Sequence, residues 1–232
     1  MTFDTLRQTA LDNTHLVPSV ELLRKFERLV ACPSPFGKPG ICYQDYDFKG
    51  AIACTELEGV LLYEAVRRSK AKRVLEIGCA TGWSTAHLAF DPSVHVTAID
   101  PFTEIEHGSS FNAIRRFEKN LLSHSNVELV VGHSPEAIPD ETWDLAFIDG
   151  SHLNGAPLRD VKGALPYITS DACFMLHDAC MFDVKEALKH LHEVGYTTRV
   201  LETTNSLAIA WPLRAVWVDS FIGFANKGLG YA

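Results

Sequence analysis

The stretch RVLEIGCATGWST, residues 73–85, decides the fold class of this 232-residue chain. An apolar run typical of a strand turns directly into a glycine-containing loop and then into a helix-forming segment. Glycine allows a tight turn and lets backbone N–H groups approach a ligand closely. Because open α/β sheets bind ligands at the carboxyl ends of their strands, Gly78 and Gly82 mark a predicted ligand site.

The rest of the chain repeats this alternation of apolar runs and amphipathic segments, which predicts helices packed on a seven-stranded, mostly parallel sheet. Only residues 203–205 join the last two runs, too few for a crossover helix, so that pair is predicted to be antiparallel. The further runs are HVTAID (95–100), VELVVG (127–132), DLAFIDG (144–150), ACFMLHD (172–178), TTRVLE (197–202) and SLAIAW (206–211). Helices are expected at 55–70, where Thr55 and Glu58 have capping-box spacing, and at 84–90, 111–122, 158–168 and 184–194.

The two ends of the chain read differently from this central domain, 55–212. Residues 1–54 predict a helical lid or loop, with an amphipathic helix at 16–30. The proline- and glycine-rich segment 31–50 cannot be a strand of the sheet and is either a connection or a lid, in which Tyr43 and Tyr46 could border an acceptor ring. The tail, 213–232, is apolar without a clear period, and it packs either on the core or on a second subunit, which would make a homodimer.

Composition narrows the function classes. With 47% hydrophobic and 22% charged residues the chain is an ordinary globular protein, and the net charge of −8 with scattered basic residues argues against a nucleic-acid partner. The six cysteines lack zinc-type spacing and are expected to be reduced thiols. Neither an export signal nor an 18-residue apolar run is visible, so we expect a cytoplasmic protein with no membrane span. From the charge we expect a small-molecule substrate.

The glycine loop favours one kind of ligand. Its spacing, Gly-Cys-Ala-Thr-Gly, is neither the dinucleotide G-x-G-x-x-G nor a phosphate loop, which makes a pyrophosphate ligand less expected. Glu76 supports this, because a carboxylate beside the turn repels phosphate but can hold a cationic amino group. Asp100 ends the second strand, where a carboxylate can accept both hydroxyls of a ribose.

The string EIGCATGWST resembles the first motif of the class I S-adenosylmethionine-dependent methyltransferases: an acid, a glycine, three small residues and a second glycine. The resemblance covers residues 55–211 and implies a three-layer, Rossmann-like fold with a terminal antiparallel strand pair. It also implies S-adenosylmethionine as cofactor, with the ribose on Asp100. The methionine end would lie beside Glu76, Gly78, Ala80, Gly82 and Ser84, with Trp83 nearby, and the adenine beside His133 and Ser134.

Ionisable residues also gather on the acceptor side of the predicted crevice. Asp149 and His152 follow the fourth strand, and His177 and Asp178 end the fifth, so all four converge on the edge that carries the glycine loop. Such a cluster is costly without a ligand, and it is what a divalent cation or a general base requires.

The strand-end acids resemble those of the divalent-metal-dependent O-methyltransferases, in which a third acid or asparagine completes a magnesium site. Here Asp149 and Asp178 match, but the third position is Ala179, which cannot ligate a metal. The string Asp-Gly-Ser-His is closer to a bacterial branch of sugar and antibiotic O-methyltransferases. That resemblance implies that Asp149 is a metal ligand and that His152 is a base or second ligand. His177 would complete a set that favours manganese, iron or zinc over magnesium.

These patterns predict transfer of a methyl group from S-adenosylmethionine to an oxygen of a small molecule, such as a sugar or a phenol of a secondary metabolite. Asp149, Asp178 and His177 would place a divalent metal (Mg, Mn or Fe), and His152 would take the proton. A metal-independent O- or N-methyltransferase that uses His152 stays open. So do two readings from other classes, an NAD-binding oxidoreductase and a non-catalytic S-adenosylmethionine-binding protein.

Overall fold

The computed structural model describes residues 29–33, 39–43, 54–102, 114–115, 117–118, 120–121 and 124–229. Its main sheet has seven strands, as predicted, and their order is β5-β4-β3-β6-β7-β9-β8. Strands β3 to β7 pair in parallel, and β9 is antiparallel to both β7 and β8. The strands are β3 (Arg73–Ile77), β4 (His95–Asp100), β5 (Val127–Val131), β6 (Trp143–Ile148), β7 (Ile168–Leu176), β8 (Thr197–Val200) and β9 (Ala208–Trp211).

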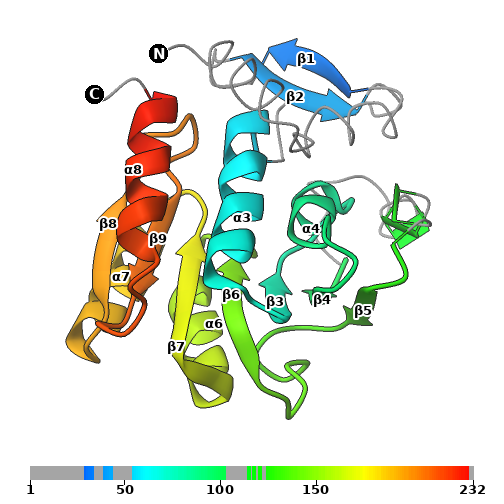
Figure 1. The fold of residues 1–232 in the computed structure, drawn as a ribbon. Coiled ribbons are helices and arrows are strands. Elements are labelled where there is room, and N and C mark those ends of the chain that lie inside the picture. Colours follow the sequence, from blue (N-terminus) through cyan, green and yellow to red (C-terminus); the bar gives the residue numbers. More distant parts are fainter. Residues whose placement is uncertain are drawn as a thin grey trace.

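Helices cover both faces of this sheet, which confirms the three-layer architecture (Figure 1). Alternate residues of a strand face opposite layers. Leu145 and Phe147 of β6 therefore join the core under α3, α4 and α8, whereas Ala146 and Ile148 join the core under α6 and α7. The helices are α3 (Glu56–Ser69), α4 (Trp83–Leu88), α6 (Ala156–Ala164), the 3₁₀ turn η2 (Leu165–Tyr167), α7 (Phe182–Glu193) and α8 (Val218–Leu229).

The strand order sets where a ligand can bind. From β3 the chain runs outward to β4 and β5 on one side, and β6 and β7 then lie on the other side. The loops after β3 and β6 therefore diverge at a topological switch point, the usual ligand crevice of an open α/β sheet. Both loops carry residues that the sequence singles out.

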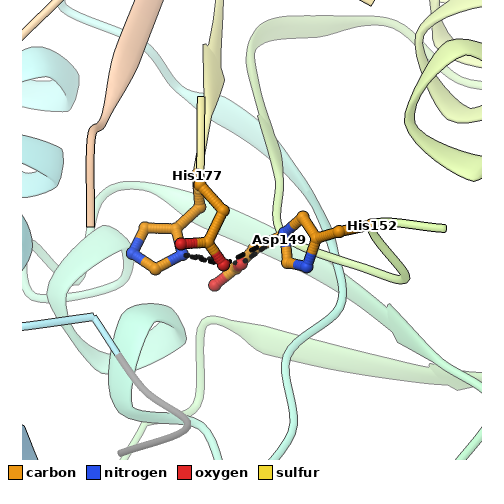
Figure 2. A group of neighbouring side chains, drawn as sticks. Asp149, His152 and His177 are labelled. Carbon is orange, nitrogen blue, oxygen red and sulfur yellow. Dashed lines mark ion pairs between the residues drawn. The ribbon is translucent and has the colours of Figure 1, made fainter. Parts of the chain in front are cut away.

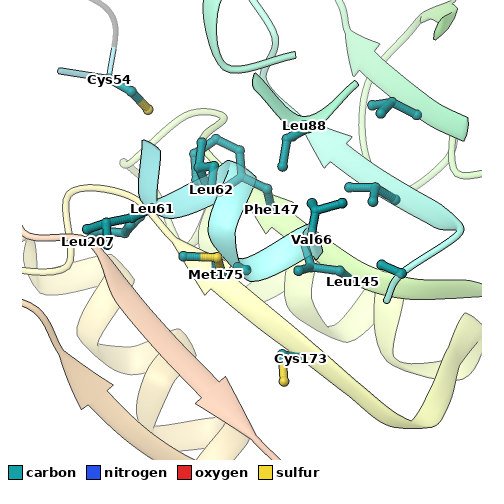
Figure 3. Close-up of a cluster of buried hydrophobic side chains, with 14 of the residues drawn as sticks. Cys54, Leu61, Leu62, Val66, Leu88, Leu145, Phe147, Cys173, Met175 and Leu207 are labelled. Atoms are coloured by element: carbon teal, nitrogen blue, oxygen red, sulfur yellow. The ribbon is translucent and has the colours of Figure 1, made fainter. Parts of the chain in front are cut away.

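Helix α3 begins at the predicted capping box. The Thr55 hydroxyl accepts the backbone N–H of Glu58 at 3.3 Å, and the Thr55 N–H donates to Glu58 Oε2 at 2.7 Å. Behind this start, Leu61, Leu62 and Val66 are buried against the sheet (Figure 3). The cap thus fixes the first turn of a core helix next to the predicted crevice.

The segment before α3 corrects two expectations. Strands β1 (Leu29–Pro33) and β2 (Pro39–Tyr43) form an antiparallel pair separate from the main sheet. The helix predicted for 16–30 is therefore wrong at its last two residues, and the loop predicted for 31–50 contains strand. Pro33 and Pro39 face each other at the end of the ladder, a position where the missing N–H does little harm. The rest of the predicted lid, with Tyr46, lies outside the described residues.

The tail corrects a third expectation, because it contains α8 rather than unpatterned chain. Ala215, Val218, Phe221, Ile222 and Ala225 recur at helical spacing and are buried in the core beside α3. The other apolar residues of the tail hide this period in the sequence. Within the described part of the chain, no helix is both long and apolar enough to cross a membrane.

Candidate active site

Two loops touch at the crevice, one after β3 and one after β6. Gly78 has a φ of +87°, and a Cβ placed on it would lie 2.2 Å from the carbonyl oxygen of Asp149. The Gly78 N–H donates to Ile99 of β4 at 2.8 Å, and the Asp149 N–H donates to Ile77 of β3 at 2.8 Å. Only glycine fits this left-handed, crowded position. The predicted glycine loop therefore lies directly against the loop that carries the predicted acceptor-side acid.

Glu76 is fully buried in β3, below the glycine loop. Its Oε1 accepts the hydroxyl of Ser84 at 2.5 Å, whereas its Oε2 makes no well-formed hydrogen bond with any described residue. Burial raises the pKa of Glu76 to about 8, although the bond from Ser84 opposes that rise. A buried carboxylate oxygen without a donor fits the predicted role, which is to receive an ammonium group.

Asp100 holds the glycine loop against the end of β4. Its Oδ2 accepts the N–H groups of Cys79 at 3.1 Å and Ala80 at 2.9 Å, and its Oδ1 accepts that of Phe102 at 2.7 Å. The carboxylate thus has a structural task that the sequence did not indicate. Oδ2 already accepts two N–H groups, whereas Oδ1 keeps a second lone pair for a ribose hydroxyl, so the predicted role stays a prediction.

The residues predicted to lie beside adenine continue along the same edge of the sheet. His133 and Ser134 follow β5 after Gly132, and the Gly132 N–H donates to the Asp100 carbonyl at 3.1 Å. His133 is exposed and Ser134 is half-buried. Their place next to Asp100 is compatible with one nucleoside spanning both loops.

Four side chains from the loops after β6 and β7 form the second half of the site, and three of them are labelled in Figure 2. His177 Nδ1 lies 3.0 Å from Asp149 Oδ1 and 3.6 Å from Asp178 Oδ2. His152 Nε2 lies 3.5 Å from Asp149 Oδ1 and 3.6 Å from Asp178 Oδ2. The predicted convergence of Asp149, His152, His177 and Asp178 is therefore what the structure shows.

Charge explains how these groups coexist without a ligand. Burial works to raise the pKa of Asp149, but the charges and hydrogen bonds of His177 and His152 outweigh it and lower that pKa to about 2. Burial likewise works to lower the pKa of His177, but Asp149 raises it well above its usual range. The Nδ1 proton of His177 then occupies the space between nitrogen and carboxylate oxygen that a cation would occupy.

The donor set fits a divalent cation. One ligand atom from each of Asp149, His152, His177 and Asp178 can lie within 4.8 Å of the other three. Two carboxylates with two imidazoles are typical of manganese, iron or zinc rather than of magnesium alone. Asp178 has a φ of +51°, an uncommon backbone conformation that aspartate tolerates and that is often found at functional sites.

Sequence reasoning missed three residues at this site. Cys54 is buried, and its Sγ lies 3.8 Å from Asp149 Oδ2. Glu58 is also buried, and its Oε2 lies 3.3 Å from His177 Nε2. Asp160 of α6 is buried near Gly150, and burial raises its pKa to about 6. Of the three, only Glu58 gave a sequence signal, the capping box, and that signal indicates a helix start rather than a site.

Comparison with known proteins agrees with this fold. Residues 75–179 match the sequence model of a methyltransferase domain family, and no curated protein sequence matches the chain. A protein from Staphylococcus aureus assigned as a caffeoyl-CoA O-methyltransferase is similar in structure, with a TM-score of 0.63 and 18% identity over 90% of this chain and 98% of that one.

Two further solved structures carry cofactor. An O-methyltransferase from Bacillus cereus in complex with S-adenosylhomocysteine (SAH) has a TM-score of 0.59 and 14% identity, over 89% of this chain and 97% of that one. TomG from Streptomyces achromogenes, an O-methyltransferase of tomaymycin synthesis in complex with S-adenosylmethionine, has a TM-score of 0.55 and 19% identity, over 69% of this chain and 82% of that one. Residues 75–179 therefore match a methyltransferase domain, and the chain has the fold of these S-adenosylmethionine- and SAH-bound methyltransferases.

Proposed function

We propose that this protein transfers a methyl group from S-adenosylmethionine to a hydroxyl oxygen of a small molecule, with a divalent cation bound by its acid and histidine cluster. The observation that carries the proposal is the contact between Gly78 and Asp149. It joins the loop suited to the methyl donor to the cluster suited to the acceptor, which is the proximity that an in-line displacement requires.

On the donor side, Glu76 Oε2 would receive the ammonium group of the methionine portion, and Asp100 Oδ1 would accept a ribose hydroxyl. His133 and Ser134 would lie beside adenine. The backbone between Gly78 and Gly82, with Ala80 and Ser84, would enclose the methionine chain. This assignment rests on the buried, unpaired oxygen of Glu76 and on the order of the residues along the sheet edge.

On the acceptor side, Asp149, His177 and Asp178 would hold the cation, which would polarise the acceptor hydroxyl and favour its ionised form. The acceptor oxygen attacks the sulfonium methyl carbon, the carbon–sulfur bond breaks, and SAH leaves with the electron pair. His152 is the most accessible imidazole of the cluster and would take the acceptor proton.

A hydroxyl acceptor is supported by two observations. Several structurally similar proteins are O-methyltransferases, and a cation site with carboxylate ligands binds oxygen well. The net charge of −8 disfavours a polyanion, so a neutral sugar or phenol suits the site better. Cys54, Cys79, Cys173 and Cys180 are free thiols, which suits a reducing compartment such as the cytoplasm.

The test is methylation of a panel of phenols and sugars, followed by mass spectrometry, with and without a chelator. We expect EDTA to remove turnover and Mn²⁺ to restore it. Asp149→Ala should abolish turnover but leave the affinity for SAH within about threefold, because the loop after β6 meets Gly78 through the backbone of Asp149 and not through its side chain.

A metal-independent version is the second candidate, because His152 already lies within ion-pair distance of two carboxylates that can stabilise its protonated form. If turnover survives both EDTA and Asp149→Ala, the cation is not required, and loss of turnover in His152→Ala then supports this version. N-methylated products would instead overturn the assignment of oxygen as acceptor.

A further inference from the structure

The Glu58 side chain accepts more hydrogen bonds than a helix cap requires. A capping box needs one bond from the glutamate side chain to the cap backbone. Here the Glu58 side chain has no exposed surface, and its two oxygens accept hydrogen bonds from three separate segments. The donors are Thr55 N (2.7 Å) and Oγ1 (3.0 Å), Thr203 Oγ1 (2.7 Å), Asn205 N (2.9 Å) and Nδ2 (3.2 Å), and His177 Nε2 (3.3 Å).

The chemistry of these donors fixes how Glu58 meets His177. The N–H groups of Thr55 and Asn205 can only donate, so they require acceptor oxygens on Glu58. The hydroxyls of Thr55 and Thr203 and the side-chain amide of Asn205 also donate to these oxygens, so the donors leave no position for a proton on the carboxyl. An ionised carboxylate has no hydrogen to give. The contact with His177 therefore needs a proton on Nε2 of the imidazole ring.

A proton held on Nε2 determines the task of the other ring nitrogen. Nδ1 faces Asp149 and Asp178 at 3.0 and 3.6 Å, on the side of the ring opposite Glu58. A neutral imidazole carries one proton, so a ring held as Nε2–H presents the Nδ1 lone pair to the cluster. Carboxylates commonly orient metal-binding histidines in this way.

We propose that Glu58 is a positioning residue, whose carboxylate holds the Nε2–H of His177 and thereby aims Nδ1 at the cation site formed with Asp149 and Asp178. This inference rests on the cation site of the proposed function. It gives the turn between β8 and β9 a part in the site, because Thr203 and Asn205 hold the carboxylate in place.

The test compares Glu58→Gln with Asn205→Ala. Glutamine preserves the shape and is itself a capping-box residue, so helix α3 should still form. The glutamine amide has only one acceptor atom for the five donor groups of Thr55, Thr203 and Asn205. The Nε2–H of His177 also loses its charged partner. Asn205→Ala removes one bond to Glu58 and leaves the His177 contact intact, which makes it the matched control.

Two measurements decide the outcome. Electron paramagnetic resonance should show Mn²⁺ affinity reduced about 10- to 100-fold in Glu58→Gln and by less than about threefold in Asn205→Ala. In Mg²⁺-saturated, ¹⁵N-histidine-labelled protein, long-range ¹H–¹⁵N spectra should show His177 as the Nε2–H tautomer in the wild type and in Asn205→Ala, and a loss of that preference in Glu58→Gln. The His177 signals are those absent from His177→Gln.

The contrary results are equally distinct. If Glu58→Gln loses only thermal stability and keeps both Mn²⁺ affinity and the tautomer, Glu58 is merely structural and the proposal is wrong. If the wild type binds no Mn²⁺, the cation of the proposed function is wrong. The spectra of the metal-free protein then decide on Glu58 alone, since an unprotonated Nε2 in the wild type, or an unchanged ring signal in Glu58→Gln, overturns its role.

Discussion

At the scale of single residues, Glu76 links cofactor binding to pH. Its pKa is raised to about 8, so at neutral pH the carboxyl is mostly protonated and must lose its proton to pair with an ammonium group. Affinity for SAH should therefore rise as pH increases toward 8, by up to tenfold between pH 6 and pH 7. Titration calorimetry at these two values measures the slope.

Glu76→Gln supplies the control for this pH dependence. The amide cannot ionise, so the variant should bind SAH more weakly than the wild type at pH 7. Its own affinity should hardly change between pH 6 and pH 7. A wild-type affinity that does not change between the two values would show that Glu76 does not receive the ammonium group.

Gly78 allows a second prediction at this scale. In Gly78→Ala the new methyl group would meet the Asp149 carbonyl at 2.2 Å on a backbone with positive φ, so the two loops must separate. We expect at least a 100-fold loss of SAH affinity by calorimetry and a loss of about 2–4 kcal/mol in urea unfolding.

Gly195→Ala is the control that separates backbone strain from the steric contact introduced by Gly78→Ala. Gly195 also has a positive φ, +99°, but nothing lies within 4 Å of its added Cβ. This variant should lose about 1 kcal/mol of stability and keep its affinity for SAH. Equal losses of affinity in the two variants would contradict the proposed closeness of donor loop and acceptor loop.

The residues of the site differ in how visible they are in the sequence. Asp149, His152, His177 and Asp178 could be predicted because the ends of parallel strands must meet at one edge of the sheet. Glu58 could not, because its partner His177 is 119 positions away and the helix cap explains its local pattern fully. Contacts between distant segments depend on packing that no local pattern records.

At the scale of elements, the same distinction holds. The strands and the capped helix α3 follow from period and spacing, and the structure confirms them. The composition did not predict strands β1 and β2, since a segment rich in proline and glycine favours a loop. Helix α8 was hidden because apolar residues on several faces obscure its helical period.

The packing of α8 yields a prediction about this element. Phe221 is fully buried beside α3, so Phe221→Ala should lower the free energy of unfolding by about 3–5 kcal/mol in urea titrations. Leu213→Ala, at a side chain 89% exposed, should change it by less than about 0.5 kcal/mol. If Phe221→Ala unfolds no more readily and only changes the oligomeric state in ultracentrifugation, α8 packs on a second subunit.

At the scale of the whole molecule, the switch point between β3 and β6 creates the crevice in which a nucleoside cofactor would bind. The residues around it restrict which kind of cofactor fits. The loop after β3 lacks the dinucleotide spacing, and the buried Glu76 disfavours a phosphate close to it. A cofactor with an ammonium group is therefore expected to stabilise the fold, whereas a dinucleotide is not.

Thermal unfolding with the two cofactor types tests this at the level of the entire fold. A ligand at 100 times its dissociation constant adds about 2.7 kcal/mol of stability, which is about 5–10 °C in melting temperature for a domain of this size. We expect that shift with SAH and none with NADH at the same concentration. The SAH shift should disappear in Gly78→Ala and persist in Gly195→Ala, since only the first disturbs the crevice. A shift with NADH alone would instead favour an oxidoreductase built on the same sheet.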